Sequence, residues 1–489
     1  MLQLTVLPLA AFVLALLLIM AIVIVAGAGF RWPGRMFSYL MLLIASTSVA
    51  TTILSGRVLT FVDENLVVSS EADVGSAVST KLLLMVVIGC SAALCVGWIL
   101  NFRNYKTSFD RFSNRGLKAP TDITIAFMVF YVAFSVLPIL FGQHYYFHVN
   151  LIYPFFIYLA LFLWARLSSA DPVIVAKRCL GLIVFSSLIA AIVAPGLVMQ
   201  SGYVGLIPGF DLRFWGVTSH ANTLGAVACM FLVLELAEPS ARAWLRTCIL
   251  AAAGLTLILT QSKSSMLAAF VGFSIIFCWR LLSRTDEVIA DSKRGSSIPI
   301  GLFGGFIILV SVVGALAIFL DMDILAALEG QLDARAVGHL STATGRTLIW
   351  DAAIEGGLEN PLFGQGADFW GLKNRLRLGL TGAASAHNLF LQTFSRSGFV
   401  GLIALFVFFY FLVQYSIRAA KHTRGGSMAI LAVLLMRSAF EANFQLNSVL
   451  AGEFFVMMAH FTYVIDRGAR PRRSFEPASL RYGSVRGRA

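Results

Sequence analysis

Four polar segments interrupt an otherwise apolar sequence, and they carry the side chains that could do chemistry. These segments lie at 211–222, 260–265, 344–366 and 386–401. Arg213 and Arg346 stand out because a planar guanidinium binds phosphate or carboxylate through two parallel hydrogen bonds. His387 stands out because an imidazole titrates near neutral pH and can accept a proton. The three side chains are therefore candidates for anion binding and proton transfer.

Five further side chains are weaker candidates for substrate binding. Two of them have a purely structural alternative: Lys263 sits in a short turn where a lysine often only extends its ammonium group to water, and His220 is well placed to cap the next helix. Asn388 follows His387 directly and could orient a substrate. Arg437 and Glu441 lie one helical turn apart in an apolar stretch, which predicts a mutual ion pair near the membrane surface that could touch substrate.

The sequence predicts no metal ion and no other cofactor. It contains neither a DxD nor an HExxH motif. The six cysteines lie inside or at the edges of apolar stretches without a CxxC pair, which favours simple packing over a disulfide or a metal site.

Composition indicates the elements that must position these residues. Hydrophobic residues make up 58% of the 489 residues, charged residues only 13%, and the mean hydropathy is +0.83. Soluble proteins carry about a quarter charged residues. The net charge of +12 does not indicate nucleic-acid binding, because the basic residues fall mostly in short connections between apolar stretches. The sequence therefore predicts an integral membrane protein.

The apolar stretches predict an all-α, polytopic bundle of about 12–13 membrane-spanning helices. The candidate spans lie near 5–27, 36–55, 82–100, 121–141, 148–166, 179–199, 220–237, 244–260, 264–282, 299–320, 398–417, 427–440 and 446–465. Basic residues are concentrated in alternate connections, such as 101–120 and 418–426, and in the tail after 466. By the positive-inside rule these connections are cytoplasmic, and the N-terminus lies outside.

One connection is far longer than the others, and it divides the chain. We expect an N-terminal bundle at 1–320, a large outer loop with short helices at 321–397, C-terminal membrane helices at 398–466 and a basic cytoplasmic tail at 467–489. With this topology all four polar segments face the outside. A second outer group, His144 and His148 around two tyrosines, is typical of the aromatic belt at a membrane surface.

Once the topology is set, the stretch 205–405 resembles the superfamily of bacterial O-antigen ligases and Wzy-type polysaccharide polymerases. The ligase pattern is His, then Asn, Ser or Gln, nine residues, Gly, two residues, and Gly or a similar residue. The residues that carry the resemblance are His387, Asn388, Gly398 and Gly401, with G-R-x-x-x-W at 345–350 and P-x-x-G-x-G at 361–366. At position 263 relatives usually carry Arg where this chain has Lys.

The resemblance implies a metal-independent glycosyltransferase in the bacterial inner membrane. It would move a glycan from an undecaprenyl-diphosphate carrier to a saccharide acceptor at the periplasmic face, alongside chain-length or export proteins. Arg213 and Arg346 would then hold the diphosphate, with Lys263 as a third cation, and His387 would deprotonate the acceptor hydroxyl. Whether the reaction is polymerisation or ligation stays open.

The alternative is a transporter or flippase that moves a lipid-linked sugar or a small solute. A transporter would place its polar residues at mid-membrane, often on broken helices related by an inverted repeat. Here the polar residues gather at one face beside one long loop, which favours one-sided chemistry.

Overall fold

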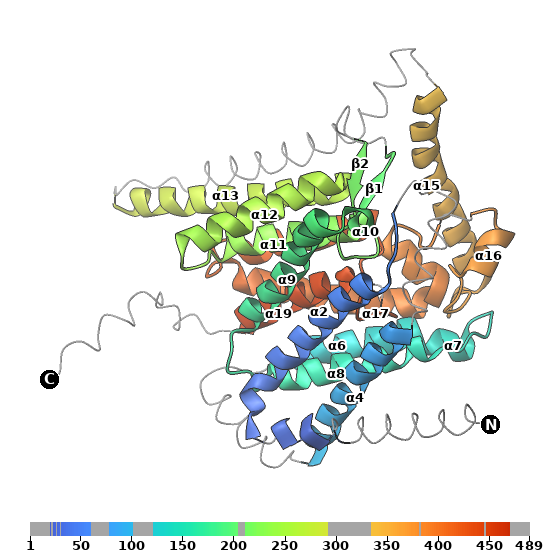
Figure 1. The fold of residues 1–489 in the computed structure, drawn as a ribbon, viewed down its shortest axis with the longest axis horizontal. Coiled ribbons are helices and arrows are strands. Elements are labelled where there is room, and N and C mark those ends of the chain that lie inside the picture. Colours follow the sequence, from blue (N-terminus) through green and yellow to red (C-terminus); the bar gives the residue numbers. More distant parts are fainter. Residues whose placement is uncertain are drawn as a thin grey trace.

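The structure is a computed structural model, and it describes residues 20, 23–25, 27–29, 31–59, 78–100, 121–203, 211–291, 334–380, 383–444 and 446–469. Within these ranges the secondary structure is almost entirely helical, with one two-stranded sheet. The helices run side by side as a bundle, and α15 (Ala334–Glu359) and α16 (Leu372–Arg377) lie at one end of it (Figure 1). The predicted all-α bundle is confirmed.

The other elements follow one another along the chain with short connections where both ends are described. The first half contains η1 (Pro33–Arg35), α2 (Met36–Leu54), α4 (Val78–Leu100), α6 (Thr121–Tyr131), η2 (Val132–Val136), α7 (Leu137–Phe141), η3 (Val149–Leu151), α8 (Tyr153–Ala165), α9 (Pro172–Val193) and α10 (Pro195–Val198). The second half contains β1 (Met199–Ser201), β2 (Leu212–Phe214), α11 (Ala221–Ala237), α12 (Ala243–Thr260), α13 (Lys263–Asp291), α17 (Leu389–Ala420), α18 (Gly426–Phe440) and α19 (Gly452–Ala469). β1 and β2 pair antiparallel.

Several of these helices are long and apolar enough to cross a membrane. In the described part of the chain there are 7, at Pro33–Leu54, Thr80–Leu100, Asp122–Phe141, Pro172–Val193, Ala243–Thr260, Lys263–Leu281 and Leu389–Ala420. Shorter apolar helices occupy Val149–Ala165, Ala221–Ala237 and Gly426–Phe440. The predicted spans near 5–27 and 299–320 lie largely or wholly outside the described residues, and each remaining span has a helical counterpart.

Two helices begin earlier than the hydropathy pattern predicts. α9 starts at Pro172, because the Asp171 carboxylate accepts a hydrogen bond from the Val173 amide at 2.9 Å and proline suits the first turn. α17 starts at Leu389, but Gly398 has non-helical backbone angles, so the part of α17 after this break begins where the span was predicted. The outer loop also differs from expectation, since α15 is a single helix of 26 residues rather than a short one.

The middle of the bundle is packed with aromatic side chains. The ring of Phe127, fully buried on α6, meets the rings of Tyr158, Phe162, Phe408 and Phe461 at centroid distances of 5.0–5.5 Å, all edge-to-face. Such pairs add roughly 0.5–1.5 kcal/mol each beyond the burial of their area. This packing joins α6 to α8, α17 and α19, and it fixes the helix ends that carry the polar residues.

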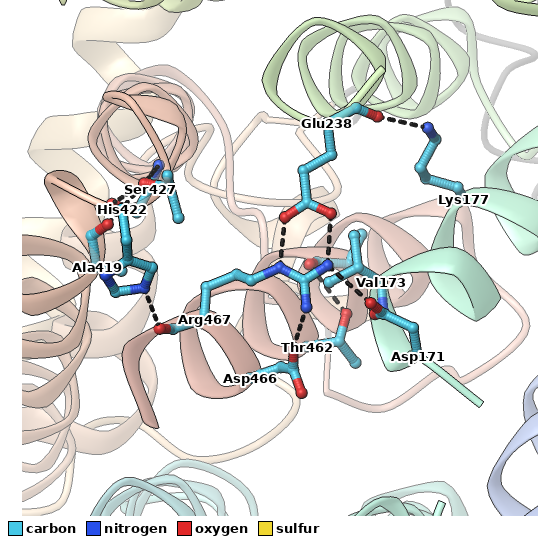
Figure 2. A network of polar contacts seen from close by, with 12 residues as sticks. Asp171, Val173, Lys177, Glu238, Ala419, His422, Ser427, Thr462, Asp466 and Arg467 are labelled. Atoms are coloured by element: carbon cyan, nitrogen blue, oxygen red, sulfur yellow. Dashed lines mark hydrogen bonds and ion pairs between the residues drawn. The ribbon is translucent and has the colours of Figure 1, made fainter. Parts of the chain in front are cut away.

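At the predicted cytoplasmic end, a network of charged side chains ties the end of α19 to the start of α9 and the end of α11. Arg467 near the end of α19 forms ion pairs with Asp171, Glu238 and Asp466, as Figure 2 shows. Its backbone oxygen also accepts a hydrogen bond from His422, in the turn between α17 and α18. Because Arg467 is only 3% exposed, three carboxylates offset the cost of burying its charge.

Candidate active site

The short sheet positions Arg213. This residue pairs with Gln200 in the β1–β2 register, and its guanidinium points towards the start of α11 and the end of α12. Nη2 donates to Oδ1 of Asn222 at 2.9 Å, and Nε donates to the Thr260 carbonyl at 3.4 Å. The guanidinium carbon lies 4.4 Å from the ring centroid of Tyr203, a cation–π contact. The Asn222 side chain, the Thr260 carbonyl and the Tyr203 ring thus hold the Arg213 side chain in place.

Two side chains that the sequence analysis did not identify hold this region in place. Gln261 adopts a left-handed backbone conformation (φ +51) after α12. Its side-chain nitrogen Nε2 donates to the Leu212 carbonyl at 2.9 Å. Arg57, just after α2, donates to the backbone oxygens of Leu197, Gly216 and Thr218. The sequence signal for Arg57 was weak: it is one of the few basic residues in the connections predicted to lie outside.

His220 is the N-cap of α11, as the sequence predicts. Its Nδ1 accepts a hydrogen bond from the Asn222 amide at 3.1 Å, and its ring lies 4.8 Å from the ring of Trp215. Burial, reinforced by the charge of Arg213, lowers the pKa of His220 to about 3. The imidazole therefore stays neutral at physiological pH, and a neutral Nδ1 can serve as the acceptor that the cap requires.

Glu441 is the centre of the site. Its Oε1 accepts a hydrogen bond from the amide nitrogen of Asn222 at 3.1 Å, and its Oε2 lies 3.1 Å from Nδ1 of His387. The side chains of His387 and Glu441 are 31% and 13% exposed, so the carboxylate is sheltered while the imidazole still reaches solvent. The structure thereby brings together three residues: Asn222 on α11, His387 just before α17, and Glu441 just after α18.

Electrostatics keep the Glu441 carboxylate ionised. Burial alone would raise the pKa of Glu441, but the hydrogen bond and charge of His387, together with the charges of Arg437 and Arg346, lower it to about 2. An ionised carboxylate accepts hydrogen bonds and donates none. Both neighbours of Glu441 must therefore point hydrogens at it.

This requirement sets the direction of every hydrogen bond in the chain from Arg213 to His387. A guanidinium only donates, so the Asn222 oxygen faces Arg213 and the Asn222 NH₂ group faces Glu441. Glu441 then accepts the Nδ1 hydrogen of His387. In this tautomer Nε2 of His387 carries a free lone pair, and Nε2 is the atom that can take a proton from a substrate.

The prediction of an ion pair between Arg437 and Glu441 is wrong. In the described chain Nη1 of Arg437 donates to Oγ of Ser265 at 2.6 Å. The Ser265 hydroxyl also accepts a hydrogen bond from the Ser262 hydroxyl at 2.9 Å. α18 ends at Phe440, and Glu441 has extended backbone angles (φ −147°, ψ 152°), so the two residues do not share a helix face. The Arg437 guanidinium acts on the Glu441 carboxylate only through its charge, whereas the Glu441 amide donates to the Arg437 carbonyl at 2.7 Å.

Arg346 and Lys263 are less tightly placed than Arg213. Arg346, on α15, is half-buried and close enough to Glu441 for its charge to lower the pKa of that carboxyl. No described residue accepts a hydrogen bond from its guanidinium. Lys263 is the exposed first residue of α13, three positions after Thr260, whose carbonyl accepts from Arg213. The cationic role of both residues stays a prediction.

The backbone around His387 explains why Asn follows it. His387 has φ +46, a left-handed conformation that costs energy outside glycine and often occurs at functional sites. The Asn388 oxygen caps α17 by accepting from the amides of Phe390 and Leu391, and its NH₂ group donates to the Ala439 carbonyl at 3.1 Å. The polar ends of the Asn388 side chain thus bind backbone and hold the residue next to His387 in place, and a contact of Asn388 with substrate stays a prediction.

The spaced glycines of the motif have a structural role. Gly398 interrupts α17 with φ +60, and the amide of the next residue donates to the Pro361 carbonyl at 2.7 Å. A Cβ on Gly398 would lie 2.4 Å from that oxygen. At Gly401 a Cβ would lie 2.0 Å from the hydroxyl of Ser397. Gly398 therefore allows the 361–366 segment to dock against α17, which begins two residues after His387, and Gly401 leaves room for the Ser397 side chain within α17.

In the ranges that the structure covers, no group of three or more His, Cys, Asp and Glu side chains could hold a metal ion. The absence of a metal from the reaction stays a prediction.

Comparison with known proteins gives one result. No curated protein matches the chain. A family model described as O-Antigen ligase matches residues 248–406, a stretch that includes Lys263, Arg346 and His387 but neither Arg213 nor Glu441. This match confirms the resemblance drawn from the sequence: residues 248–406 of this membrane protein are similar to the O-antigen ligase family.

Proposed function

We propose that this protein is a glycosyltransferase that moves a glycan from undecaprenyl diphosphate to a hydroxyl group of a saccharide acceptor, at the periplasmic face of the bacterial inner membrane. The observation that carries the proposal is the 3.1 Å contact between His387 Nδ1 and Glu441, within a chain of hydrogen bonds that starts at Arg213. It supports a histidine base prepared to accept a proton beside an arginine.

In the proposed step the acceptor hydroxyl gives its proton to Nε2 of His387 while its oxygen attacks the anomeric carbon of the donor. The bond between that carbon and the phosphate oxygen breaks, and its electron pair leaves with the lipid diphosphate. Glu441 stabilises the imidazolium that forms, since its negative charge lies 3.1 Å from Nδ1. The proton then passes from the imidazolium to water or to the released diphosphate.

Negative charge grows on the diphosphate as the bond breaks, so cations must lie beside it. Arg213 is half-buried and already oriented by Asn222 and Thr260, which lowers the entropy lost on binding an anion. No described residue accepts a hydrogen bond from the Arg346 guanidinium, so its N–H groups can form two parallel hydrogen bonds to a phosphate. Lys263 adds a flexible positive charge at the N-terminal end of α13, where the helix dipole also favours an anion.

The arrangement favours transfer over transport. His387, Glu441 and Asn222 lie at helix ends, where α17 and α11 begin and α18 ends, rather than in the middle of the bundle. A transporter would place its binding residues at mid-membrane. Glu238, at the other end of α11, pairs with Arg467, so the candidate site lies at the opposite end of α11 from this ion-pair network.

Replacing His387 with glutamine tests the proposal. The amide of glutamine can still donate to Glu441 but cannot take a proton, so transfer in vitro from purified lipid-linked glycan should fall by about 100-fold or more. The control is His144→Gln, because the exposed side chain of His144 lies outside the site. Donor binding should persist in both variants. Transfer at the wild-type rate in His387→Gln would reject the proton-accepting role.

A further inference from the structure

A second polar cluster lies in the same outer part of the molecule, away from the chain of hydrogen bonds at Glu441. It is built around Arg396, which sits on the first part of α17, before the break at Gly398. Asp368, in the turn between α15 and α16, and Tyr146, in the connection between α7 and η3, complete the cluster. None of the three takes part in the proposed proton transfer.

Backbone hydrogen bonds lock these three segments together. The amides of Gln143 and His144 donate to the carbonyls of Gly364 and Gln365, at 3.2 and 2.9 Å. The amide of Gly366 in turn donates to the carbonyl of Arg396 at 3.2 Å. Gly366 has φ +117, and a Cβ there would lie 2.6 Å from the His144 carbonyl, so only glycine permits this approach. The cluster is a built feature rather than a chance meeting of loops.

Arg396 is buried without a hydrogen-bonding partner. Only 6% of the residue is exposed, and its guanidinium carbon lies 4.5 Å from the ring centroid of Phe134. Its Nε finds no acceptor, and no described residue forms an ion pair or hydrogen bond with the guanidinium. Leaving a buried charged donor unsatisfied costs more than the ~1–3 kcal/mol of a neutral group. The Nε–H group of Arg396 is therefore a buried donor for which the described residues supply no acceptor.

Asp368 and Tyr146 present the complementary features. No described donor reaches the half-buried carboxylate of Asp368, which feels the charges of Arg396 and Arg375. The half-buried ring of Tyr146 lies parallel to the ring of His148, with centroids 6.3 Å apart, and Tyr146 feels the charges of Asp368 and Arg396. One cluster thus holds a buried donor, a sheltered acceptor and a flat ring.

We propose that Arg396, Asp368 and Tyr146 form a binding site for a sugar residue of the saccharide acceptor. A sugar hydroxyl can accept from Arg396 and donate to Asp368 at the same time, and the C–H face of a sugar ring can pack on Tyr146. A free anion fits less well, because the carboxylate of Asp368 would repel it. The site rests on the proposed function, since it assigns the acceptor a place separate from the donor diphosphate.

Binding of a phosphate-free glycan tests the proposal. The probes are two phosphate-free oligosaccharides of the source organism, titrated against the full-length protein in detergent micelles: the glycan released by mild acid from its lipid-linked form, which is the acceptor in a polymerisation, and the lipopolysaccharide core, which is the acceptor in a ligation. Asp368→Asn and Tyr146→Ala should each weaken binding about tenfold or more, since a hydrogen bond to a charged group is worth ~1.5–3 kcal/mol. Both should raise the acceptor KM and leave the donor KM unchanged.

Matched controls lie close by. Tyr145→Ala removes the neighbouring ring, which is 77% exposed, and Asp351→Asn removes an exposed carboxylate from α15. Both should bind the oligosaccharide as the wild type does. Equal affinity in all four variants would overturn the site, as would weaker binding accompanied by a lower unfolding temperature, which would assign the residues to the fold.

The outcomes also separate this site from the proposed function. Transfer by the wild type with unchanged oligosaccharide binding in Asp368→Asn and Tyr146→Ala removes the site and leaves the function. Oligosaccharide binding that depends on both residues, in a protein that transfers no glycan, keeps the site and removes the function.

Discussion

Replacing Glu441 with glutamine should stop most transfer, because it reverses a chain of hydrogen bonds. Arg213 fixes the Asn222 oxygen at 2.9 Å, so the Asn222 NH₂ group must point at residue 441. A new amide at 441 must accept that bond with its oxygen, and its own NH₂ group then faces Nδ1 of His387. Nδ1 becomes an acceptor, the ring proton moves to Nε2, and Nε2 can no longer take a proton from the acceptor.

The expected loss is the full contribution of a general base. Such a base accelerates a reaction by about 100- to 10,000-fold, or ~2.7–5.4 kcal/mol at 1.36 kcal/mol per factor of ten. Removing the charge of Glu441 while keeping the tautomer would cost less, roughly the ~1 kcal/mol that separates charged from neutral hydrogen bonds. The size of the loss therefore distinguishes a wrong tautomer from a missing charge.

A second substitution should restore the direction of the chain. In the double variant Asn222→Asp with Glu441→Gln, the new carboxylate accepts from both Arg213 and the new amide. The amide oxygen then faces Nδ1 of His387 and restores the active tautomer, and the total charge equals that of the wild type. Single-turnover transfer of a labelled lipid-linked glycan, with the wild type and both variants at equal concentration, would measure the recovery.

Two results would refute this reasoning. A Glu441→Gln variant within severalfold of the wild-type rate would show that the tautomer of His387 is not set by residue 441. A double variant no faster than Glu441→Gln, with the same unfolding temperature, would show that the direction of the Asn222 bond does not matter.

Three further experiments test other parts of the molecule. Arg346→Lys keeps the charge but loses the planar fork, so transfer should fall by about 10- to 100-fold at unchanged abundance, whereas Lys263→Arg should be tolerated. Gly398→Ala should lower the free energy of unfolding by ~1–3 kcal/mol in a thermal melt, because a Cβ there would lie 2.4 Å from a backbone oxygen; Gly379→Ala, with φ +69 and no atom within 4 Å, should cost less. Compartment reporters fused at 116 and 379 should give opposite signals, and matching signals would contradict the topology.

Hydropathy was sufficient to predict most of the described bundle. The stretch 244–260 became α12 at Ala243–Thr260, because an apolar run of that length in a membrane has few alternatives to a helix. The start of α17 was missed for a definite reason. Gly398 looked like the beginning of the span, but it is a break inside a longer helix, and a positive φ leaves no mark on hydropathy.

The sequence predicted the residues of the site better than it predicted the contacts between them. His387 and Glu441 were both candidates, yet the sequence paired Glu441 with Arg437, since a separation of four residues suggests one helix face. That rule fails where the helix stops at Phe440. Nothing local could reveal that Glu441 contacts a histidine 54 positions away, or that Arg57 supports the loop before α11.

The site depends on two helix ends meeting at one point. Asn388 caps α17 and at the same time binds the Ala439 carbonyl at 3.1 Å, so the residue after His387 is tied to the residue two before Glu441. Arg437 holds the end of α18 against α13 through Ser265. With both ends fixed, the 3.1 Å contact between Nδ1 and the carboxylate needs little further ordering. In the proposed mechanism His387 is thus a base beside its own anchor, Asn388, while the carboxylate that orients the base, Glu441, lies beyond residue 406, outside the matched stretch.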